Sequence, residues 1–336
     1  MSPCRGSTAA TIYEVVSGRG RRGVHHVDTP DRTHVGCRRG PPAGQFRLST
    51  DSDRPVAPMI SVVIPVRNGM PLLEEQLRAL AAQQCDEPWE VIVSDNGSND
   101  GSLEFARDWA ATRPNVHVVD ASGLTGASAA RNAGVDVARG DLLAFCDADD
   151  VVLAGWLAAC AEALKSADLV AGRFDFWSLN LIPPAPPVRA ATRQLGFLPA
   201  GLGANLAVRR HPFEEVGGFD ETCIPGEDID LCWRLQLRGF TFAEAPAAVV
   251  AKRARSDFHS VFVQAYAYGK CGPLLHKRYR KAGAGRDLMG ALKAWAWLVV
   301  SLPRIAQPTR RIEWARGAGT RLGRIEASIR LRVFFP

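Results

Sequence analysis

Three carboxylates directly follow a short apolar run in the middle of this 336-residue chain. The apolar residues 142–146 are succeeded by Asp147, Asp149 and Asp150. Carboxylates so close together repel each other unless a cation lies between them, and Mg²⁺ and Mn²⁺ prefer oxygen ligands, often sharing their shell with substrate phosphates. The cluster therefore indicates a divalent-cation site. An acidic loop that caps the next helix is the alternative.

Alternating strand and helix patterns surround this cluster. We expect strands at 60–66, 90–93, 116–119, 142–145, 169–174 and 203–209, and helices at 72–80, 103–109, 128–138 and 227–237. Such alternation predicts an α/β fold with a mostly parallel, Rossmann-like sheet and helices on both faces. Ligands of such sheets bind at the carboxyl ends of the strands, where the acidic cluster lies. A dinucleotide-binding fold of the usual kind is disfavoured, because no GxGxxG motif follows the first strand.

Five short segments carry polar residues at the ends of these predicted elements. They are 61–68, 94–102, 129–134, 147–150 and 226–234. An isolated Asp-x-Asp occurs by chance in many proteins, but all five segments in this order resemble the family 2 glycosyltransferases, which have the GT-A fold. The resemblance covers about residues 59–252 and implies a GT-A domain there.

The resemblance implies a nucleotide-sugar site formed by Pro65, Arg67, Asp95, Arg131 and Asp147. The carboxylate of Asp95 would accept a hydrogen bond from an imide N–H of the base, which is uracil in the best-known members. The guanidinium of Arg131 suits a diphosphate. The alternatives are that Asp95 only caps the turn after its strand, and that Arg131 forms an ordinary surface ion pair.

The resemblance also implies roles for the acidic residues. Asp149 and Asp147 match the Asp-x-Asp of the family, so they would hold Mg²⁺ or Mn²⁺ on the donor diphosphate, with Asp147 also supporting the ribose. Asp228 matches the catalytic base of inverting members, although an acid at a helix N-terminus is also favoured by the helix dipole alone. Glu227 and Asp230 rank below it as first-turn acids. Arg234 is expected to pair with a phosphate or with these acids.

The function that this resemblance predicts is inverting transfer of a single sugar from a nucleotide-diphosphate sugar to a hydroxyl acceptor. The acceptor would be a glycan or a lipid-linked molecule in cell-envelope, polysaccharide or glycolipid synthesis. The Gln-x-x-Arg-Trp signature of processive synthases is absent, since 236–240 do not match it, which favours a non-processive enzyme of bacterial type. A sugar nucleotidyltransferase and a non-catalytic nucleotide-sugar binder are the alternatives. The intact Asp147, Asp149 and Asp228 argue against the binder.

Charge is distributed unevenly along the chain. Residues 59–251 hold 14 basic and 26 acidic side chains, whereas residues 252–336 hold 18 basic and 4 acidic ones. In the second segment, basic residues alternate with aromatic and aliphatic ones, among them Trp295 and Trp297. This mixture predicts amphipathic helices at an anionic membrane surface. Basic helices that simply pack on the acidic domain are the alternative. Nucleic acid is disfavoured as a partner, because no nucleic-acid-binding module is present.

These patterns divide the chain into three parts. Residues 1–58 show no sustained apolar period and are predicted to be disordered; a transit peptide and translation from Met59 are alternatives. Residues 59–251 form the GT-A domain and 252–336 the basic helical region. Eight cysteines without a CxxC pair favour a reducing, cytoplasmic compartment, and no apolar run is long enough to span a bilayer. We therefore expect a cytoplasmic protein that is peripheral on the inner face of the cell membrane.

Overall fold

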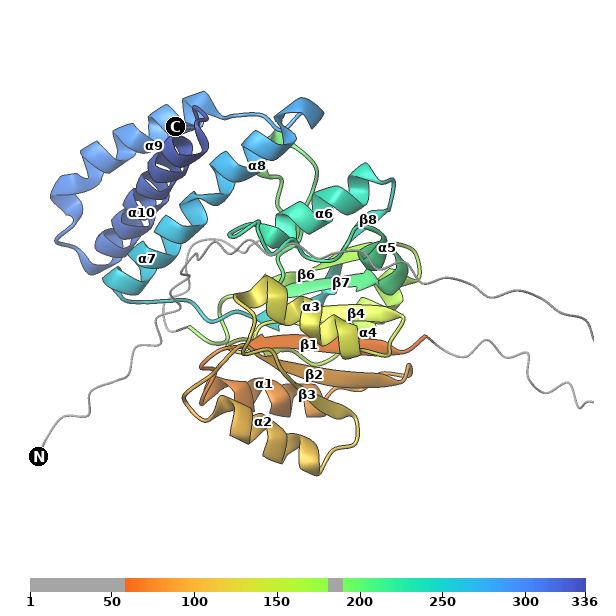
Figure 1. The fold of residues 1–336 in the computed structure, drawn as a ribbon. Coiled ribbons are helices and arrows are strands. Elements are labelled where there is room, and N and C mark those ends of the chain that lie inside the picture. The colour runs from red at the N-terminus through yellow and green to blue at the C-terminus, as the bar shows by residue number, and fades with distance from the viewer. Residues whose placement is uncertain (1–57, 181–189) are drawn as a thin grey trace, which may run out of the picture. The chain divides into compact units, whose positions relative to one another are not determined.

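A computed structural model describes residues 58–180 and 190–336 (Figure 1). Disorder, a transit peptide and a start at Met59 were the expectations for residues 1–58, of which all but position 58 lie outside this described part.

One mixed sheet of eight strands organises the described residues between 60 and 251. Its order is β3-β2-β1-β4-β7-β6-β8-β5. The strands are β1 (Ile60–Val66), β2 (Trp89–Asp95), β3 (Val116–Asp120), β4 (Leu142–Cys146), β5 (Val151–Val152), β6 (Leu169–Asp175), β7 (Asn205–Arg209) and β8 (Phe242–Ala251). The first four strands are parallel, whereas β7 runs antiparallel to both β4 and β6. The predicted α/β architecture is confirmed.

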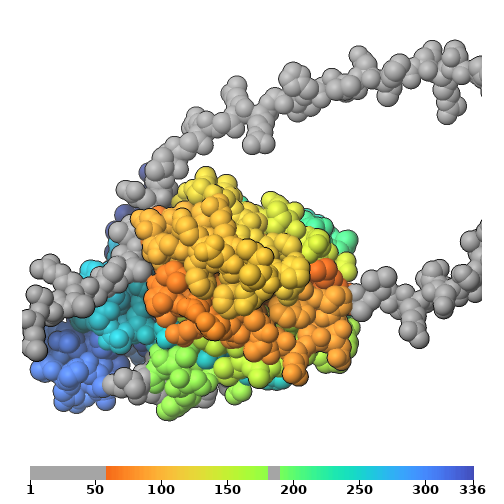
Figure 2. All heavy atoms as spheres, turned by 90° about the horizontal axis from the view of Figure 1, so that it is seen from below, coloured from red at the N-terminus to blue at the C-terminus, as the bar shows by residue number. Residues whose placement is uncertain are grey.

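Helices cover both faces of this sheet (Figure 1). They are α1 (Leu72–Ala81), α2 (Ser102–Ala111), α3 (Ala127–Val137), α4 (Trp156–Leu164), α5 (Arg210–Glu215) and α6 (Glu227–Leu237), with a short 3₁₀ turn at Gln194–Gly196. One core cluster joins α1, α2 and α4 to the sheet, and the other joins α3, α5 and α6. Strands buried on both faces require continuous apolar runs, which explains the composition of β1 and β4. In the space-filling view, the segment from β1 to α3 (orange to yellow) forms most of the near face (Figure 2).

Helix α3 lies very close to the sheet because of one glycine. A Cβ at Gly134 would lie 2.5 Å from Cγ1 of Val63, a separation that atoms do not tolerate. The absence of a side chain therefore sets the depth of α3, the helix that carries Arg131.

Four longer helices follow β8. They are α7 (Phe258–Gly269), α8 (Cys271–Tyr279), α9 (Leu288–Ser301) and α10 (Pro308–Leu331), with short 3₁₀ turns at Arg280–Ala282 and Leu302–Arg304. The predicted helical character of the C-terminal region is confirmed. Helix α8 buries Cys271, Leu275 and Tyr279 in the same cluster as α6. Within the described residues, no helix has the length and apolarity that crossing a membrane would require.

Candidate active site at the carboxyl ends of the strands

Strand register brings the predicted site residues to one edge of the sheet. Val66 at the end of β1 pairs with Asp95 at the end of β2, and Val63 pairs with Phe145 of β4, one residue before that strand ends. The carboxyl ends of these parallel strands therefore lie side by side, and the turns that follow them share one face.

Asp95 is the last residue of β2 and is almost fully buried. Its Oδ2 accepts hydrogen bonds from the backbone N–H groups of Gly97 and Ser98, each at 3.0 Å. Its Oδ1 is buried and has no hydrogen-bond partner among the described residues. One oxygen thus caps the turn, as the simpler alternative expected, while the other is available to a ligand donor.

The turn after β1 is fastened to the turn after β2. The backbone N–H of Asn68 donates to Oγ of Ser98 at 2.9 Å, and the N–H of Asn99 donates to Oδ1 of Asn68 at 2.9 Å. Pro65 is half-buried in the strand, and Arg67 is exposed at its end. These contacts hold the two predicted nucleotide-binding turns as one unit.

Arg131 on α3 joins the acidic cluster to helix α6. Its guanidinium is buried and donates to Oδ1 of Asp147 at 2.8 Å and to Oε1 of Glu227 at 3.2 Å. A Cβ at Gly203 would lie 3.1 Å from Cζ of Arg131, so the glycine makes room for the guanidinium. Burial alone would lower the pKa of Arg131, but the two carboxylates raise it. The ion pairs of Arg131 are therefore buried and bridge two elements of the site, unlike the surface ion pair that was the alternative to nucleotide binding.

The carboxylates of Asp147, Asp149 and Asp150 lie together as the sequence predicted. One oxygen from each lies within 4.8 Å of the others. Asp149 is exposed, whereas Asp150 is buried and accepts a hydrogen bond from the backbone N–H of Arg253 at 2.9 Å. Three hard oxygen donors at this spacing fit Mg²⁺ or Mn²⁺.

Lys252 contributes a cation to the same cluster, which the sequence did not lead us to expect. It directly follows β8, and its Nζ lies 2.6 Å from Oδ2 of Asp150 and 3.2 Å from Oδ2 of Asp147. Burial alone would lower the pKa of Lys252, but the carboxylates raise it well above its ordinary value, so the ammonium group is charged. Burial would likewise raise the pKa of Asp147, but Lys252 and Arg131 lower it. The sequence offered no signal for this contact, because Lys252 is 105 residues from Asp147 and no strand was predicted before it.

Asp228 lies at the start of α6, beside the bridge formed by Arg131. Its Oδ2 accepts a hydrogen bond from the backbone N–H of Gly203 at 3.0 Å, and its Oδ1 accepts one from the N–H of Ile229 at 2.8 Å. Burial, followed by the charge of Glu227, raises the pKa of Asp228 to about 6. A carboxylate with such a pKa is well matched to accepting a proton near neutral pH.

Asp230, two residues further on, has a different environment. It is fully buried and accepts hydrogen bonds from Nε of Arg234 at 2.7 Å, from Arg278 at 2.6 Å and from the hydroxyl of Tyr279 at 2.6 Å. Of the two expectations for Arg234, the structure contains the pairing with an acid. Because Arg278 and Tyr279 belong to the α8 region, this cluster fastens the helix that bears Asp228 to the C-terminal region.

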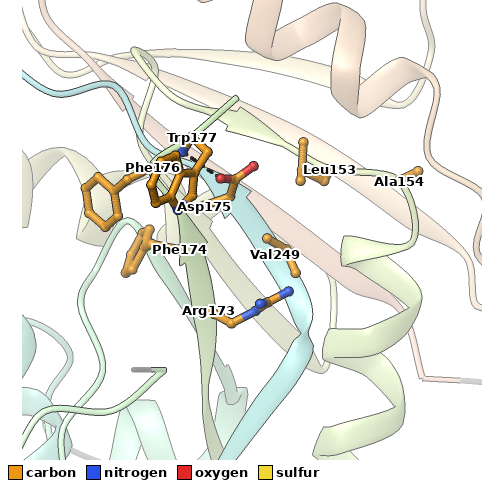
Figure 3. Close-up of a pocket in the computed structure, with 8 residues that line it drawn as sticks. All are labelled: Leu153, Ala154, Arg173, Phe174, Asp175, Phe176, Trp177 and Val249. Atoms are coloured by element: carbon orange, nitrogen blue, oxygen red, sulfur yellow. Dashed lines mark hydrogen bonds between the residues drawn. The ribbon is translucent and has the colours of Figure 1, made fainter. Parts of the chain in front are cut away.

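A pocket of about 290 Å³ lies near the carboxyl ends of β6 and β8, and Asp175, Trp177 and Val249 are among its lining residues (Figure 3). The side chain of Trp177 is 67% exposed at this pocket, and its backbone N–H donates to Oδ1 of Asp175 at 2.7 Å. The backbone N–H of Lys252 donates to the carbonyl oxygen of Asp175 at 2.8 Å. Asp175, which lines the pocket, thus contacts through its carbonyl oxygen the backbone of the lysine whose ammonium group lies among the carboxylates.

Comparison with known proteins agrees with this geometry. Residues 61–200 match the family model described as glycosyl transferase family 2. The mannosyltransferase PcManGT of Pyrobaculum calidifontis, solved with GDP-Man and Mn²⁺, superposes with a TM-score of 0.58 at 21% identity, covering 81% of this chain and 87% of that one. GalNAc-T7, solved with UDP, GalNAc and Mn²⁺, superposes with a TM-score of 0.52 at 16% identity, covering 68% and 55%. The fold is therefore that of the GT-A glycosyltransferases.

Curated sequences give the same class. The glycosyltransferase AglE of Haloferax volcanii is 28% identical over 74% of this chain and 78% of its own length. The pre-mycofactocin glycosyltransferase of Mycobacterium tuberculosis is 31% identical over 70% of this chain, which spans about half of that protein, 52%. The family model and both curated relatives support a family 2 glycosyltransferase.

Proposed function

We propose that the protein transfers a single sugar from a nucleotide-diphosphate sugar to an acceptor hydroxyl, with inversion at the anomeric carbon. One observation carries the proposal: the buried guanidinium of Arg131 contacts both Asp147 and Glu227, the residue before Asp228. The acids assigned to the donor diphosphate and the acid assigned to the acceptor proton thus border the same space. A non-catalytic nucleotide-sugar binder would need the acids assigned to the diphosphate. It would not need a neighbouring carboxylate, that of Asp228, whose pKa is raised to about 6.

The nucleotide would occupy the turns after β1 and β2. The unpartnered Oδ1 of Asp95 supports its assignment as the acceptor of an N–H from the base, because a buried carboxylate oxygen without a partner is costly. Arg67, exposed at the end of β1, and Pro65 would border the same nucleotide.

The acidic cluster is assigned to a divalent ion, with Asp149 and Asp147 as ligands. Asp149 is suited to this role because its carboxylate is exposed beside the other two. When bound, the ion would supply Lewis-acid stabilisation of the charge on the departing nucleoside diphosphate. Arg131 contributes a fixed positive charge to the same region.

Asp228 would act as the base. Its carboxylate accepts the proton of the acceptor hydroxyl, whose oxygen forms the new bond to the anomeric carbon. The bond from that carbon to the donor phosphate oxygen breaks on the opposite face, and its electron pair leaves with the nucleoside diphosphate. The hydrogen bond from the N–H of Gly203 to Asp228 supports the orientation of the carboxylate.

The acceptor would reach the site from the pocket that contains Trp177. An exposed aromatic side chain beside a carboxylate suits a sugar ring, which has apolar C–H faces and polar edges. We propose a cell-envelope glycan or a lipid-linked sugar as the acceptor, reached on the cytoplasmic side of the membrane. The basic character of residues 252–336 supports this assignment.

The test is a thermal-shift panel of nucleoside diphosphates and nucleotide sugars with and without Mn²⁺, followed by turnover of the best donor. Asp149→Ala should abolish the metal-dependent shift. Asp228→Asn should keep the shift and lose turnover by about a thousandfold, in the range that general bases contribute. Asp136→Asn, an exposed change on α3, is the matched control and should resemble the wild type. Near-wild-type turnover in Asp228→Asn would show that this residue is not the base.

A further inference from the structure

Helix α9 carries its most apolar side on the outside. Its exposed side chains include Met289, Leu292, Val299 and Val300, with exposed fractions of 62%, 64%, 71% and 71%. Its buried residues are only Ala291, Leu298 and Ser301. At 100° per residue the exposed residues form one continuous stripe opposite the buried ones. This arrangement is inverted relative to an ordinary surface helix, which buries its larger apolar residues.

The inner side of α9 is already used by α10. A Cβ at Gly317 on α10 would lie 3.0 Å from the ring of Trp297, and Nε1 of Trp314 donates to the carbonyl oxygen of Leu298 at 3.1 Å. In Figure 1, α9 lies on the outer side of α10, away from the sheet. The aliphatic stripe is therefore more exposed than Trp297, whose exposed fraction is 39%.

The charge around the stripe is mostly positive. Between Asp287, which caps α9, and Glu313, which pairs with Arg310, the chain contains Lys293, Arg304, Arg310 and Arg311. All four basic side chains are exposed. An apolar stripe flanked mainly by positive charge complements a surface that is apolar inside and negative at its edge, which describes an anionic lipid bilayer.

We propose that α9 is a membrane-docking helix that lies in the plane of an anionic bilayer. Met289, Leu292, Val299 and Val300 would enter the boundary between headgroups and acyl chains, and the four basic residues would contact lipid phosphates. The lipid-linked acceptor under the proposed function gives this contact its use. The contact itself needs neither donor nor acceptor, so its failure and the failure of sugar transfer are measured separately.

The experiment is co-sedimentation of the full-length protein with two kinds of vesicle. One kind is neutral phosphatidylcholine, and the other also contains about 30 mol% of anionic phosphatidylglycerol. Each is measured at about 0.05 M salt, where charges interact over a longer range, and at about 0.5 M salt, where they are screened. We expect binding to the anionic vesicles at low salt and release at high salt. Leu292→Glu and Val300→Glu should each weaken binding by about tenfold, because a carboxylate replaces an aliphatic group at the lipid boundary. Val137→Glu is the matched control, since Val137 is 50% exposed on α3; it should bind like the wild type.

Three results would overturn the proposal. One is equal recovery of the protein in the supernatant with both kinds of vesicle. Another is an equal loss of binding in Val137→Glu and Val300→Glu. The third is a dimer in light scattering that Val300→Glu converts to a monomer while neither form binds vesicles, which would assign the stripe to an interface between two copies of the chain. Retention of the nucleotide-dependent thermal shift in Leu292→Glu and Val300→Glu would confirm that a loss of lipid binding is not a loss of folding.

Discussion

The Nζ of Lys252 lies 2.6 Å from Oδ2 of Asp150 and 3.2 Å from Oδ2 of Asp147. The chain thus places one of its own cations among the carboxylates that are assigned to a divalent ion. The site is partly neutralised before any ion or nucleotide arrives. A bound ion would have to share the cluster with this ammonium group.

We therefore predict that Lys252→Met strengthens Mn²⁺ binding in the absence of nucleotide by about tenfold, since a nearby positive charge repels the ion. Titration followed by the electron paramagnetic resonance of free Mn²⁺ measures this directly. Lys165→Met, which removes an exposed lysine that pairs with Glu162, is the control and should leave the affinity unchanged. An unchanged affinity in Lys252→Met would mean that Lys252 moves away from the cluster at no cost.

The raised pKa of Asp228 predicts a pH dependence. Below its pKa of about 6 the carboxyl is protonated and does not accept a proton from the acceptor. The value of kcat/KM should therefore fall as the pH drops through 6 and level off above it. Donor contacts that depend on Asp147 should persist to lower pH, because the pKa of that carboxyl is lowered, whereas burial raises the pKa of Asp150 to about 7. Rates and nucleotide affinity measured across this range would separate the two; a flat rate profile through pH 6 would contradict the assignment.

Asp95→Asn distinguishes the two oxygens of this carboxylate. The asparagine keeps one oxygen for the N–H groups of Gly97 and Ser98, but it presents an NH₂ group where Oδ1 now lies unpartnered. The NH₂ group of the asparagine and the imide N–H of the base are both hydrogen-bond donors, and they would face each other. Nucleotide affinity should therefore fall by about tenfold or more. Calorimetric titration with the donor selected by the thermal-shift panel gives the value. Wild-type affinity with an unchanged unfolding temperature would leave Asp95 with its turn-capping role alone.

Asp230→Asn should destabilise the protein rather than change its chemistry. The substitution leaves the charges of Arg234 and Arg278 without their buried partner, and breaking such a pair costs about 3–5 kcal/mol. Urea unfolding measures the loss, and the exposed Asp136→Asn should stay within about 0.5 kcal/mol of the wild type. A loss as small as that of the control would show that α8 does not depend on this cluster.

The same contacts bear on a truncation at Lys252. The division into residues 59–251 and 252–336 follows the change in composition, but Tyr279 and Arg278 both contact Asp230 on α6. We expect the truncated protein to unfold at a lower temperature than the full chain, because Asp230 then lacks two of its three partners. Scanning calorimetry of both proteins tests this. Equal unfolding temperatures would mean that the GT-A domain folds independently.

The sequence by itself determined several elements and the strand-end carboxylates of the site, although it did not predict β8. The periods at 60–66 and 142–145 predict β1 and β4, and helix 227–237 has the bounds of α6, because both patterns depend on neighbours a few positions apart. Carboxylates that follow parallel strands must meet at one edge of the sheet, so the clustering of Asp147, Asp149 and Asp150 could be predicted without coordinates.

Only the tertiary structure decided which charges meet across the fold. Lys252 is 105 residues from Asp147, and Arg278 is 48 residues from Asp230, and no local pattern links residues so far apart. The same limit holds for α9, whose apolar residues occur all round the helix. Which of them face outward depends on where α10 packs, and that packing leaves Leu292, Val299 and Val300 on the open side.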